Sequence, residues 1–237
     1  MYTEHTDNVF EVETMTKALF AKAMILFFSG VLLLAALIFL PAGTIAYPAG
    51  WRLMAILFVP MFIAGLVMML KSPELLKKRL KAKETQGEQK DVIRMSGLMF
   101  TAGFVIAGFD FRFGFSRLPE WVSYAACAAF LLAYALYAEV LRENMWLSRT
   151  IEVQEGQKVV STGLYGIVRH PMYAATLLMF MSMPLVLASG AAFAVFLAYP
   201  LIIAKRIRGE EALLERELEG YSAYKQKVRY RLIPFIW

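Results

Sequence analysis

Six long apolar blocks constrain the fold of this 237-residue chain more than any other feature of its sequence. They cover residues 18–39, 51–70, 93–109, 121–141, 172–187 and 191–204. About 20 apolar residues in a helix cross a hydrocarbon layer of roughly 30 Å. Apolar residues make up 59% of the chain, against about 45–50% in soluble domains. The pattern predicts an all-α polytopic membrane protein with about six transmembrane helices, and it excludes a disordered chain or a disulfide-stapled secreted domain.

The last two apolar blocks are separated by residues 188–190 alone. So short a connection predicts a tight helical hairpin over residues 172–204 rather than one long helix. Pro184 and Pro200 lie inside its two arms, where proline removes a backbone donor and bends a helix.

The distribution of basic residues predicts the orientation in the membrane. With a cytoplasmic N-terminus, 22 of the 25 Lys and Arg residues fall on the cytoplasmic side, eight of them in the loop 71–94. Because cytoplasmic loops are enriched in Lys and Arg, we expect both termini in the cytoplasm. The net charge of +6 then reflects membrane topology, and a nucleic-acid partner is not expected. We interpret the loop 71–94 as an orientation signal with a solvated amphipathic helix, and binding of anionic membrane lipid is the alternative.

Polar side chains able to carry chemistry are concentrated in two stretches, 142–173 and 205–237, which flank the hairpin. A hairpin brings its two ends together. We therefore expect His170 and Glu210 to be near neighbours, although they lie 40 positions apart.

Each stretch has a functional and a purely structural interpretation. Arg169-His170-Pro171 predicts a helix that begins at the proline. Its free N–H groups attract an anion, but the motif is also consistent with helix entry alone. Arg206 and Glu210 lie four residues apart and hence on one helix face. They form either a weak exposed ion pair or a carboxylate that holds the ammonium of an amino-acid-like ligand, with its arginine neighbour beside it.

Other chemistries lack the residues that they need. The only histidines are His5 and His170 and the only cysteine is Cys127, which is too few for a zinc site of the usual kind. No P-loop, dinucleotide-binding glycine motif or Ser/His/Asp arrangement is visible. No charged residue occupies the middle of an apolar block, which argues against an ion-coupled transporter.

Taken together, the motifs resemble the isoprenylcysteine carboxyl methyltransferase family of integral-membrane enzymes. The matching residues are Gly163-Leu164-Tyr165, Arg169-His170-Pro171-Met172-Tyr173, Arg206, Glu210-Glu211, Tyr221-Ser222-Ala223-Tyr224 and Pro234. The resemblance covers the chain downstream of Glu143. Phospholipid N-methyltransferases, small-thiol methyltransferases and, more remotely, sterol reductases share parts of this pattern.

The resemblance implies an S-adenosylmethionine-dependent methyltransferase, with four membrane helices over 1–141 and a catalytic region over 142–237. The implied cofactor pocket is lined by Gln157, Lys158, Val159, Val160, Tyr165, His170, Pro171, Met172 and Tyr173, with Glu210 on the amino group of the cofactor. Arg206 then faces the methyl acceptor, which is a lipophilic or small molecule.

The acceptor carries a carboxylate or a thiol in this interpretation. A carboxylate is ionised at neutral pH and needs no general base, so alignment of the reactants and exclusion of water suffice. A thiol benefits from a nearby cation, which Arg169 or Arg206 supplies. The alternatives are a phospholipid N-methyltransferase, an NADPH-dependent membrane reductase and a non-catalytic membrane scaffold.

Overall fold

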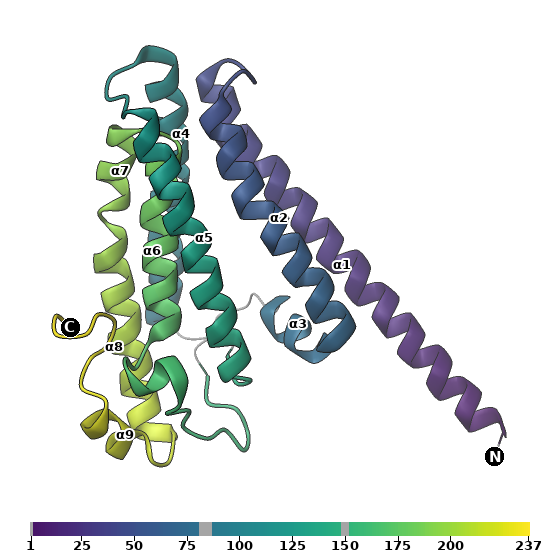
Figure 1. The fold of residues 1–237 in the computed structure, drawn as a ribbon. Helices are drawn as coiled ribbons and strands as arrows, with labels where there is room; N and C mark the ends of the chain where they lie inside the picture. Colours follow the sequence, from purple (N-terminus) through teal and green to yellow (C-terminus); the bar gives the residue numbers. More distant parts are fainter. Residues whose placement is uncertain (1, 81–86, 148–151) are drawn as a thin grey trace.

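The computed structural model describes residues 2–80, 87–147 and 152–237, and within these ranges the regular structure is helical (Figure 1). The helices are α1 (Tyr2–Ala42), α2 (Pro48–Lys71), α3 (Pro73–Leu80), α4 (Gly87–Phe113), α5 (Glu120–Glu143), the short 3₁₀ helix η1 (Gly163–Gly166), α6 (Pro171–Val186), α7 (Gly190–Phe196), α8 (Tyr199–Glu217) and α9 (Tyr221–Lys227). The expected all-α fold is confirmed.

Five helical stretches in the described residues are long and apolar enough to cross a membrane. They are Ala18–Ala42, Pro48–Lys71, Lys90–Phe113, Glu120–Glu143 and Gly190–Glu217. The remaining apolar helix, α6, has 16 residues and is therefore about 24 Å long. The protein is an integral membrane protein, whereas the count of six full spans stays a prediction.

Two predicted boundaries differ from the structure. The segment 71–94, expected as a loop with an amphipathic helix, contains the helix α3, and α4 begins within it at Gly87 rather than at residue 93. The last apolar helix does not end near residue 204 but continues as α8 through the charged residues up to Glu217. It is interrupted at residues 197–198, just before Pro200, whose ring cannot be accommodated in an unbroken helix. The predicted hairpin between α6 and α7 is present.

The helices α4 to α8 form a bundle, and the α1–α2 pair leans away from it toward the lower end in Figure 1. Within the bundle, α6 packs along α5, and α4 packs against α1, α7 and α8. Two glycines of α4 permit these close approaches. A Cβ at Gly103 would lie 2.3 Å from the Phe196 ring, and one at Gly108 would lie 2.5 Å from the carbonyl oxygen of Ile38.

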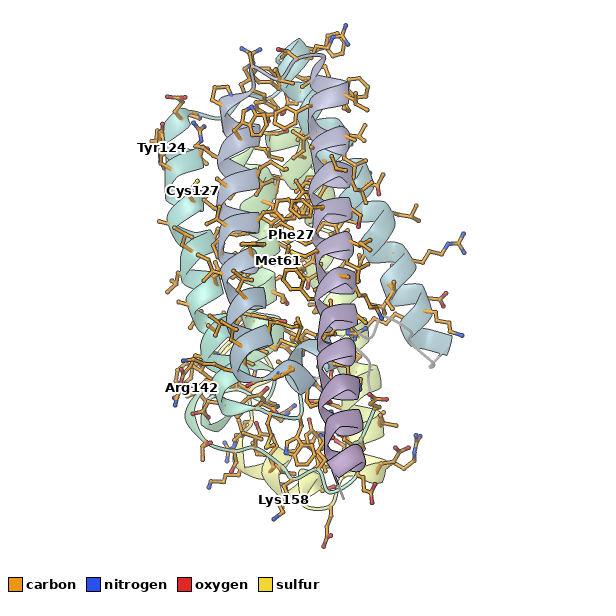
Figure 2. The ribbon with its side chains drawn as sticks, turned by 90° about the vertical axis from the view of Figure 1, so that its right-hand side faces the viewer. Phe27, Met61, Tyr124, Cys127, Arg142 and Lys158 are labelled. Carbon is orange, nitrogen blue, oxygen red and sulfur yellow. The ribbon has the colours of Figure 1, made fainter. Side chains whose placement is uncertain are left out.

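The two ends of the bundle differ in character. At one end, which Tyr124 marks in Figure 2, hydrogen bonds between buried polar groups link the α4–α5 connection to the turn between α6 and α7. There the Asp110 carboxylate accepts hydrogen bonds from the Ser116 and Ser189 hydroxyls, each at 2.5 Å. The opposite end carries Arg142 and Lys158. It is also where η1, α9 and the chain terminus gather (Figure 1).

Candidate functional site

The N-terminus of α6 is the centre of the candidate site. His170 is the residue before the helix, and Pro171 is its first residue, where a missing N–H costs nothing. The chain end runs alongside: the Arg169 and His170 amides donate to the carbonyl oxygens of Tyr230 and Arg231, both at 2.9 Å. The last stretch of the chain, residues 228–237, is called the tail below. It is thus tied by its backbone to the start of α6.

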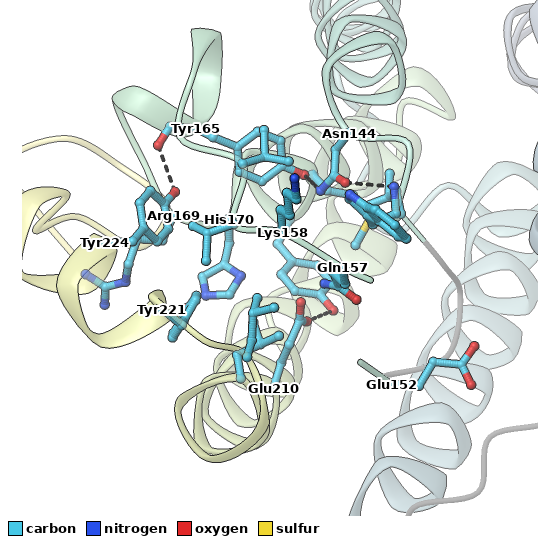
Figure 3. A pocket seen from close by; sticks show the side chains of 18 of the residues that line it. Asn144, Glu152, Gln157, Lys158, Tyr165, Arg169, His170, Glu210, Tyr221 and Tyr224 are labelled. Atoms are coloured by element: carbon cyan, nitrogen blue, oxygen red, sulfur yellow. Dashed lines mark hydrogen bonds between the residues drawn. The ribbon is translucent and has the colours of Figure 1, made fainter. Parts of the chain in front are cut away.

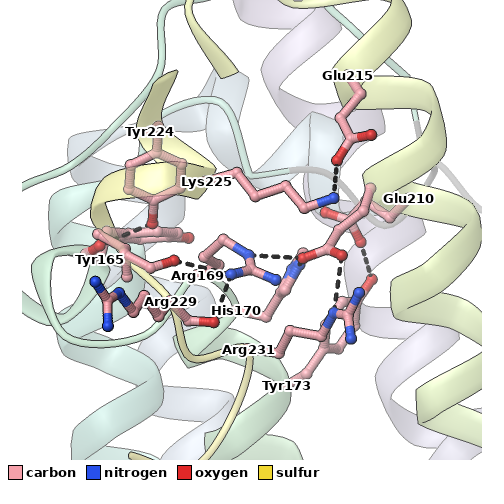
Figure 4. Close-up of polar contacts among 12 residues, drawn as sticks. Tyr165, Arg169, His170, Tyr173, Glu210, Glu215, Tyr224, Lys225, Arg229 and Arg231 are labelled. Atoms are coloured by element: carbon pink, nitrogen blue, oxygen red, sulfur yellow. Dashed lines mark hydrogen bonds and ion pairs between the residues drawn. The ribbon is translucent and has the colours of Figure 1, made fainter. Parts of the chain in front are cut away.

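Glu211 of α8 holds a buried cluster of charges together (Figure 4). Its carboxylate accepts hydrogen bonds from Arg169 Nε at 2.7 Å and from Arg231 Nε at 2.8 Å, and it lies 3.2 Å from His170 Nε2. The side chains of Arg169 and Glu211 are each 4% exposed. A second nitrogen of Arg169 donates to the carbonyl oxygens of Val228 and Arg229. This cluster therefore joins α6, α8 and the tail.

The neighbouring glutamate, Glu210, faces a different partner. Tyr173 donates its hydroxyl proton to Glu210 Oε2 at 2.5 Å and accepts a hydrogen bond from Arg206 Nε at 2.9 Å. Arg206 and Glu210 lie one turn apart on α8, so the same tyrosine from α6 contacts both. The predicted shared face of these two residues is confirmed.

The opposite wall is formed by η1 and the end of α5. The Asn144 side-chain amide donates to the Tyr165 hydroxyl at 2.8 Å, and the Tyr224 hydroxyl donates to the Tyr165 carbonyl oxygen at 2.7 Å. Gly163 has a φ of +51°, and a Cβ there would lie 2.5 Å from the Glu143 carboxylate. The glycine of the Gly-X-Tyr motif is therefore required both by its backbone conformation and by the contact with α5.

These walls enclose a cavity with about 830 Å³ of empty volume, its opening to solvent included (Figure 3). It is lined by Asn144, Trp146, Leu147, Glu152, Gln157, Lys158, Val159, Val160, Tyr165, Arg169, His170, Met172, Tyr173, Arg206, Glu210, Leu214, Leu218, Tyr221 and Tyr224. The two polar stretches meet here: His170 and Glu210 both line the cavity, and the direct contact of His170 is with Glu211 rather than with Glu210.

The predicted site residues line this cavity with one difference. Pro171 is buried and does not line it, because the proline ring forms the first turn of α6. Arg169 lines the cavity, but its guanidinium is engaged by Glu211 and the tail carbonyls. The roles assigned to these residues stay predictions.

Several lining residues were not predicted to line the site. Asn144, Trp146, Leu147 and Glu152 follow the end of α5, and Leu214 and Leu218 extend the face of α8 that carries Glu210. The helical spacing of the two leucines was a usable signal. The first four residues carried none, because their position depends on how the chain turns after α5.

Tyr221 and Tyr224 contribute phenol groups to the cavity wall. Burial raises the pKa of both hydroxyls, and for Tyr221 the nearby carboxylates of Glu211 and Glu210 add to this increase. Both therefore stay protonated and remain hydrogen-bond donors at neutral pH. The Tyr221 hydroxyl is buried and has no hydrogen-bond partner among the described residues.

The described residues contain no group of three or more His, Cys, Asp or Glu side chains placed to hold a metal ion. The cavity instead combines carboxylate, guanidinium, phenol and imidazole groups with aliphatic walls. Such a mixture is typical of a site for a polar organic ligand with an apolar part.

Residues 118–219 match the model of a protein family described as phospholipid methyltransferase. This range extends from just before α5 to just beyond α8, and it includes η1, the start of α6 and Glu210. The match covers less than half of the chain, and its description agrees with the class of enzyme that the sequence motifs indicate.

A solved structure similar to this chain is described as that of the eukaryotic intramembrane Ras methyltransferase ICMT (isoprenylcysteine carboxyl methyltransferase) without a monobody. The two chains are 19% identical, the likeness covers 91% of this chain and 86% of the other, and the TM-score is 0.46. The curated proteins contain no match to this sequence.

Proposed function

We propose that the cavity binds S-adenosylmethionine and that the protein transfers the methyl group to a carboxylate or thiol of a lipophilic or small acceptor. The observation that carries the proposal is the joint contact of Arg206 and Glu210 with the Tyr173 hydroxyl at the cavity wall. The helix α8 thereby presents a carboxylate and a guanidinium to the same cavity. A cofactor with an ammonium group and an acceptor with a negative charge require this pair of groups.

The described residues fit this cofactor. Glu210 offers a carboxylate for an ammonium group, and such charge-assisted hydrogen bonds are stronger than neutral ones. Val159, Leu214 and Leu218 offer apolar surface for a purine ring. The buried hydroxyl of Tyr221, which has no partner among residues 2–80, 87–147 and 152–237, is a further group whose hydrogen bond a ligand would complete.

The sulfonium of the bound cofactor supplies an electrophilic methyl group. The protein then has to align an acceptor with that group and to keep water away from the acceptor anion. Arg206 is placed to pair with an anionic acceptor, and Tyr173 holds its guanidinium by the hydrogen bond at 2.9 Å. Membrane helices beside the cavity allow a lipophilic acceptor to approach from the bilayer.

A phospholipid amine is the second candidate acceptor, and the family match favours it. The two candidates differ in charge. An ammonium group is repelled by Arg206 and must lose a proton before it accepts a methyl group, whereas a carboxylate is attracted as it stands. The position of Arg206 beside the cavity supports the anionic acceptor.

The proposed site belongs to the cytoplasmic face. The two ends of the chain and α9, which contributes Tyr221 and Tyr224 to the cavity, lie toward the lower end of the molecule in Figure 1. The Lys and Arg bias of the sequence supports a cytoplasmic position for that end. The cofactor then enters from the aqueous side.

Calorimetric titration of the purified protein in detergent tests the cofactor. We expect binding of S-adenosylmethionine, weaker binding to Glu210→Ala and His170→Ala, and no binding of NADPH. Binding of NADPH alone would indicate a reductase, and binding of neither ligand by the folded protein would contradict the proposal.

Arg206→Gln tests the acceptor separately. We expect it to raise the KM for a carboxylate or thiol acceptor. The Kd for S-adenosylmethionine should stay within about twofold, or less than 0.5 kcal/mol, because Glu210 rather than Arg206 is the residue proposed to hold the cofactor. A faster reaction with a phospholipid amine in this variant would favour the second candidate instead.

A further inference from the structure

We propose that Glu211 holds His170 as the neutral Nε2–H tautomer, so that Nδ1 presents its lone pair to the cavity and accepts a hydrogen bond from the nucleoside half of the cofactor. The inference rests on the proposed function for the identity of the ligand, but not for the tautomer.

The first step concerns the direction of the hydrogen bond between His170 Nε2 and Glu211 Oε1, which lie 3.2 Å apart. Two guanidinium groups, those of Arg169 and Arg231, donate to the same carboxylate at 2.7 and 2.8 Å. A carboxylate paired in this way is ionised and can only accept. His170 Nε2 must therefore carry the proton in this contact.

The second step concerns the charge of the ring. The cluster already holds two guanidinium groups against the single carboxylate of Glu211, so it carries a net positive charge without the imidazole. The adjoining Arg206 and Glu210, which share the Tyr173 hydroxyl, add one positive and one negative charge and leave this balance unchanged. A protonated His170 would therefore add a further buried positive charge. Burial of an uncompensated charge is unfavourable, and the neutral ring is the favoured state. In a neutral imidazole with Nε2 protonated, Nδ1 is an acceptor.

The third step places Nδ1 at the cavity. His170 lines the cavity (Figure 3). Its Nε2 is the ring nitrogen that faces Glu211. In the described part of the chain, the buried side-chain N and O atoms without a hydrogen-bond partner are Arg52 Nε and the Tyr221 hydroxyl oxygen. Nδ1 also makes no hydrogen bond to these residues, so it is not sealed off and opens on the cavity.

The fourth step assigns the ligand group. Glu210 is the ionised acceptor at the wall and takes the ammonium of the amino-acid half. A neutral imidazole nitrogen suits a neutral donor, namely a ribose hydroxyl or the amino group of the adenine. Glu210 would thus hold the amino-acid half of the cofactor, and His170 would hold the nucleoside half. Glu211 acts on the second contact indirectly, because it sets the tautomer of His170.

Two variants separate the two ring nitrogens. In His170→Gln, the terminal amide nitrogen replaces Nε2 and keeps a donor for Glu211, but no acceptor remains at the Nδ1 position. In His170→Asn, the shorter amide offers an oxygen near the Nδ1 position and loses the contact with Glu211.

The probes are S-adenosylmethionine and 5′-methylthioadenosine, which keeps the nucleoside and lacks the amino acid. We expect His170→Gln to weaken both ligands about tenfold, the loss of one hydrogen bond, with unchanged thermal stability. His170→Asn should bind both ligands more tightly than His170→Gln and unfold at a lower temperature. Glu210→Gln is the matched control and should weaken S-adenosylmethionine alone.

Equal binding of both ligands by His170→Gln and the natural protein would overturn the assignment, as would a loss confined to S-adenosylmethionine. If the natural protein binds neither ligand, the proposed function fails. The tautomer is then still tested by the spectroscopic measurement described next.

Nitrogen NMR reads the tautomer directly, because the chain has only two histidines, His5 and His170. In protein labelled with ¹⁵N-histidine and carrying His5→Gln, we expect a protonated Nε2 and an unprotonated Nδ1 at pH 7.5. Addition of 5′-methylthioadenosine should shift the Nδ1 resonance far more than the Nε2 resonance. Protonation of Nδ1, with or without Nε2, would overturn the proposal.

Discussion

Replacement of Glu211 by glutamine should detach the tail from the bundle. Glu211 accepts hydrogen bonds from Arg169 and Arg231, and it is the carboxylate to which these two guanidinium groups donate. Breaking a buried ion pair by removing one partner costs about 3–5 kcal/mol. The Arg231 side chain is 29% exposed and can turn toward water, whereas that of Arg169 is 4% exposed and cannot. We therefore expect the lower end, about 3 kcal/mol.

Hydrogen exchange at the start of α6 measures this loss locally. The Arg169 and His170 amides donate to carbonyl oxygens of the tail, so they exchange only when the tail opens. A loss of about 3 kcal/mol corresponds to roughly a hundredfold faster exchange at both amides. The amides in the middle of α5 should not change, since α5 does not take part in the cluster.

Glu210→Gln is the matched control for this prediction, one residue away on the same helix. The glutamine oxygen still accepts the Tyr173 hydroxyl proton, so exchange at the same amides should stay within about threefold, less than 0.7 kcal/mol. Glu210→Gln should instead weaken the binding of S-adenosylmethionine. This loss of affinity should be larger than the loss that Glu211→Gln causes in molecules whose tail remains bound to the bundle. Equal exchange in the two variants would refute the assignment of Glu211 as the residue that holds the tail.

Two further predictions concern the cavity walls. Tyr221→Phe removes a buried hydroxyl that has no partner in the described part of the chain, and the burial of such a group costs about 1–3 kcal/mol. Thermal unfolding should show a more stable ligand-free protein, and calorimetry should show weaker binding of S-adenosylmethionine. A less stable variant would show that the hydroxyl has a partner after all. Gly163→Ala should lower both stability and affinity, because its Cβ would lie 2.5 Å from Glu143. Gly156→Ala shares the positive φ but meets no atom within 4 Å, so it should lower stability by only about 1–2 kcal/mol and leave affinity unchanged.

The helices and the membrane environment could be predicted because they depend on local pattern. An apolar run of sufficient length must satisfy its backbone within itself in a bilayer, and a helix is the way in which a single segment does so. The hairpin turn and the helix start at Pro171 were equally local, since three residues and one proline set them. The meeting of the two polar stretches then followed from the hairpin.

The sequence could not predict the rotation of α8 about its own axis, which decides the side chains that face the cavity. Glu210 and Glu211 are adjacent and chemically identical, and the spacing from Arg206 together with the family resemblance favoured Glu210 for the ligand. In the structure, Glu211 is buried among Arg169, Arg231 and His170, and Glu210 lines the cavity. Successive side chains on a helix point about 100° apart, and the contact of Glu211 with Arg231 of the tail fixes which of the two glutamates faces the cavity.

The partners of Arg169 and Tyr221 also depend on the tertiary structure and could not be predicted. The sequence offered Arg169 as a cation for the acceptor, but the structure places its guanidinium on Glu211 and on the carbonyl oxygens of Val228 and Arg229. The unpartnered hydroxyl of Tyr221 had no sequence signal, because the absence of a partner is a property of the whole fold.

The sequence by itself determined which segments are helical, which of them enter a membrane and which side chains are available for chemistry, because these depend on neighbours along the chain. The tertiary structure alone decided which of those side chains face the cavity and which hold it together. That choice depends on contacts between α6, α8 and the tail, and no spacing along the sequence encodes the angle at which separate elements pack.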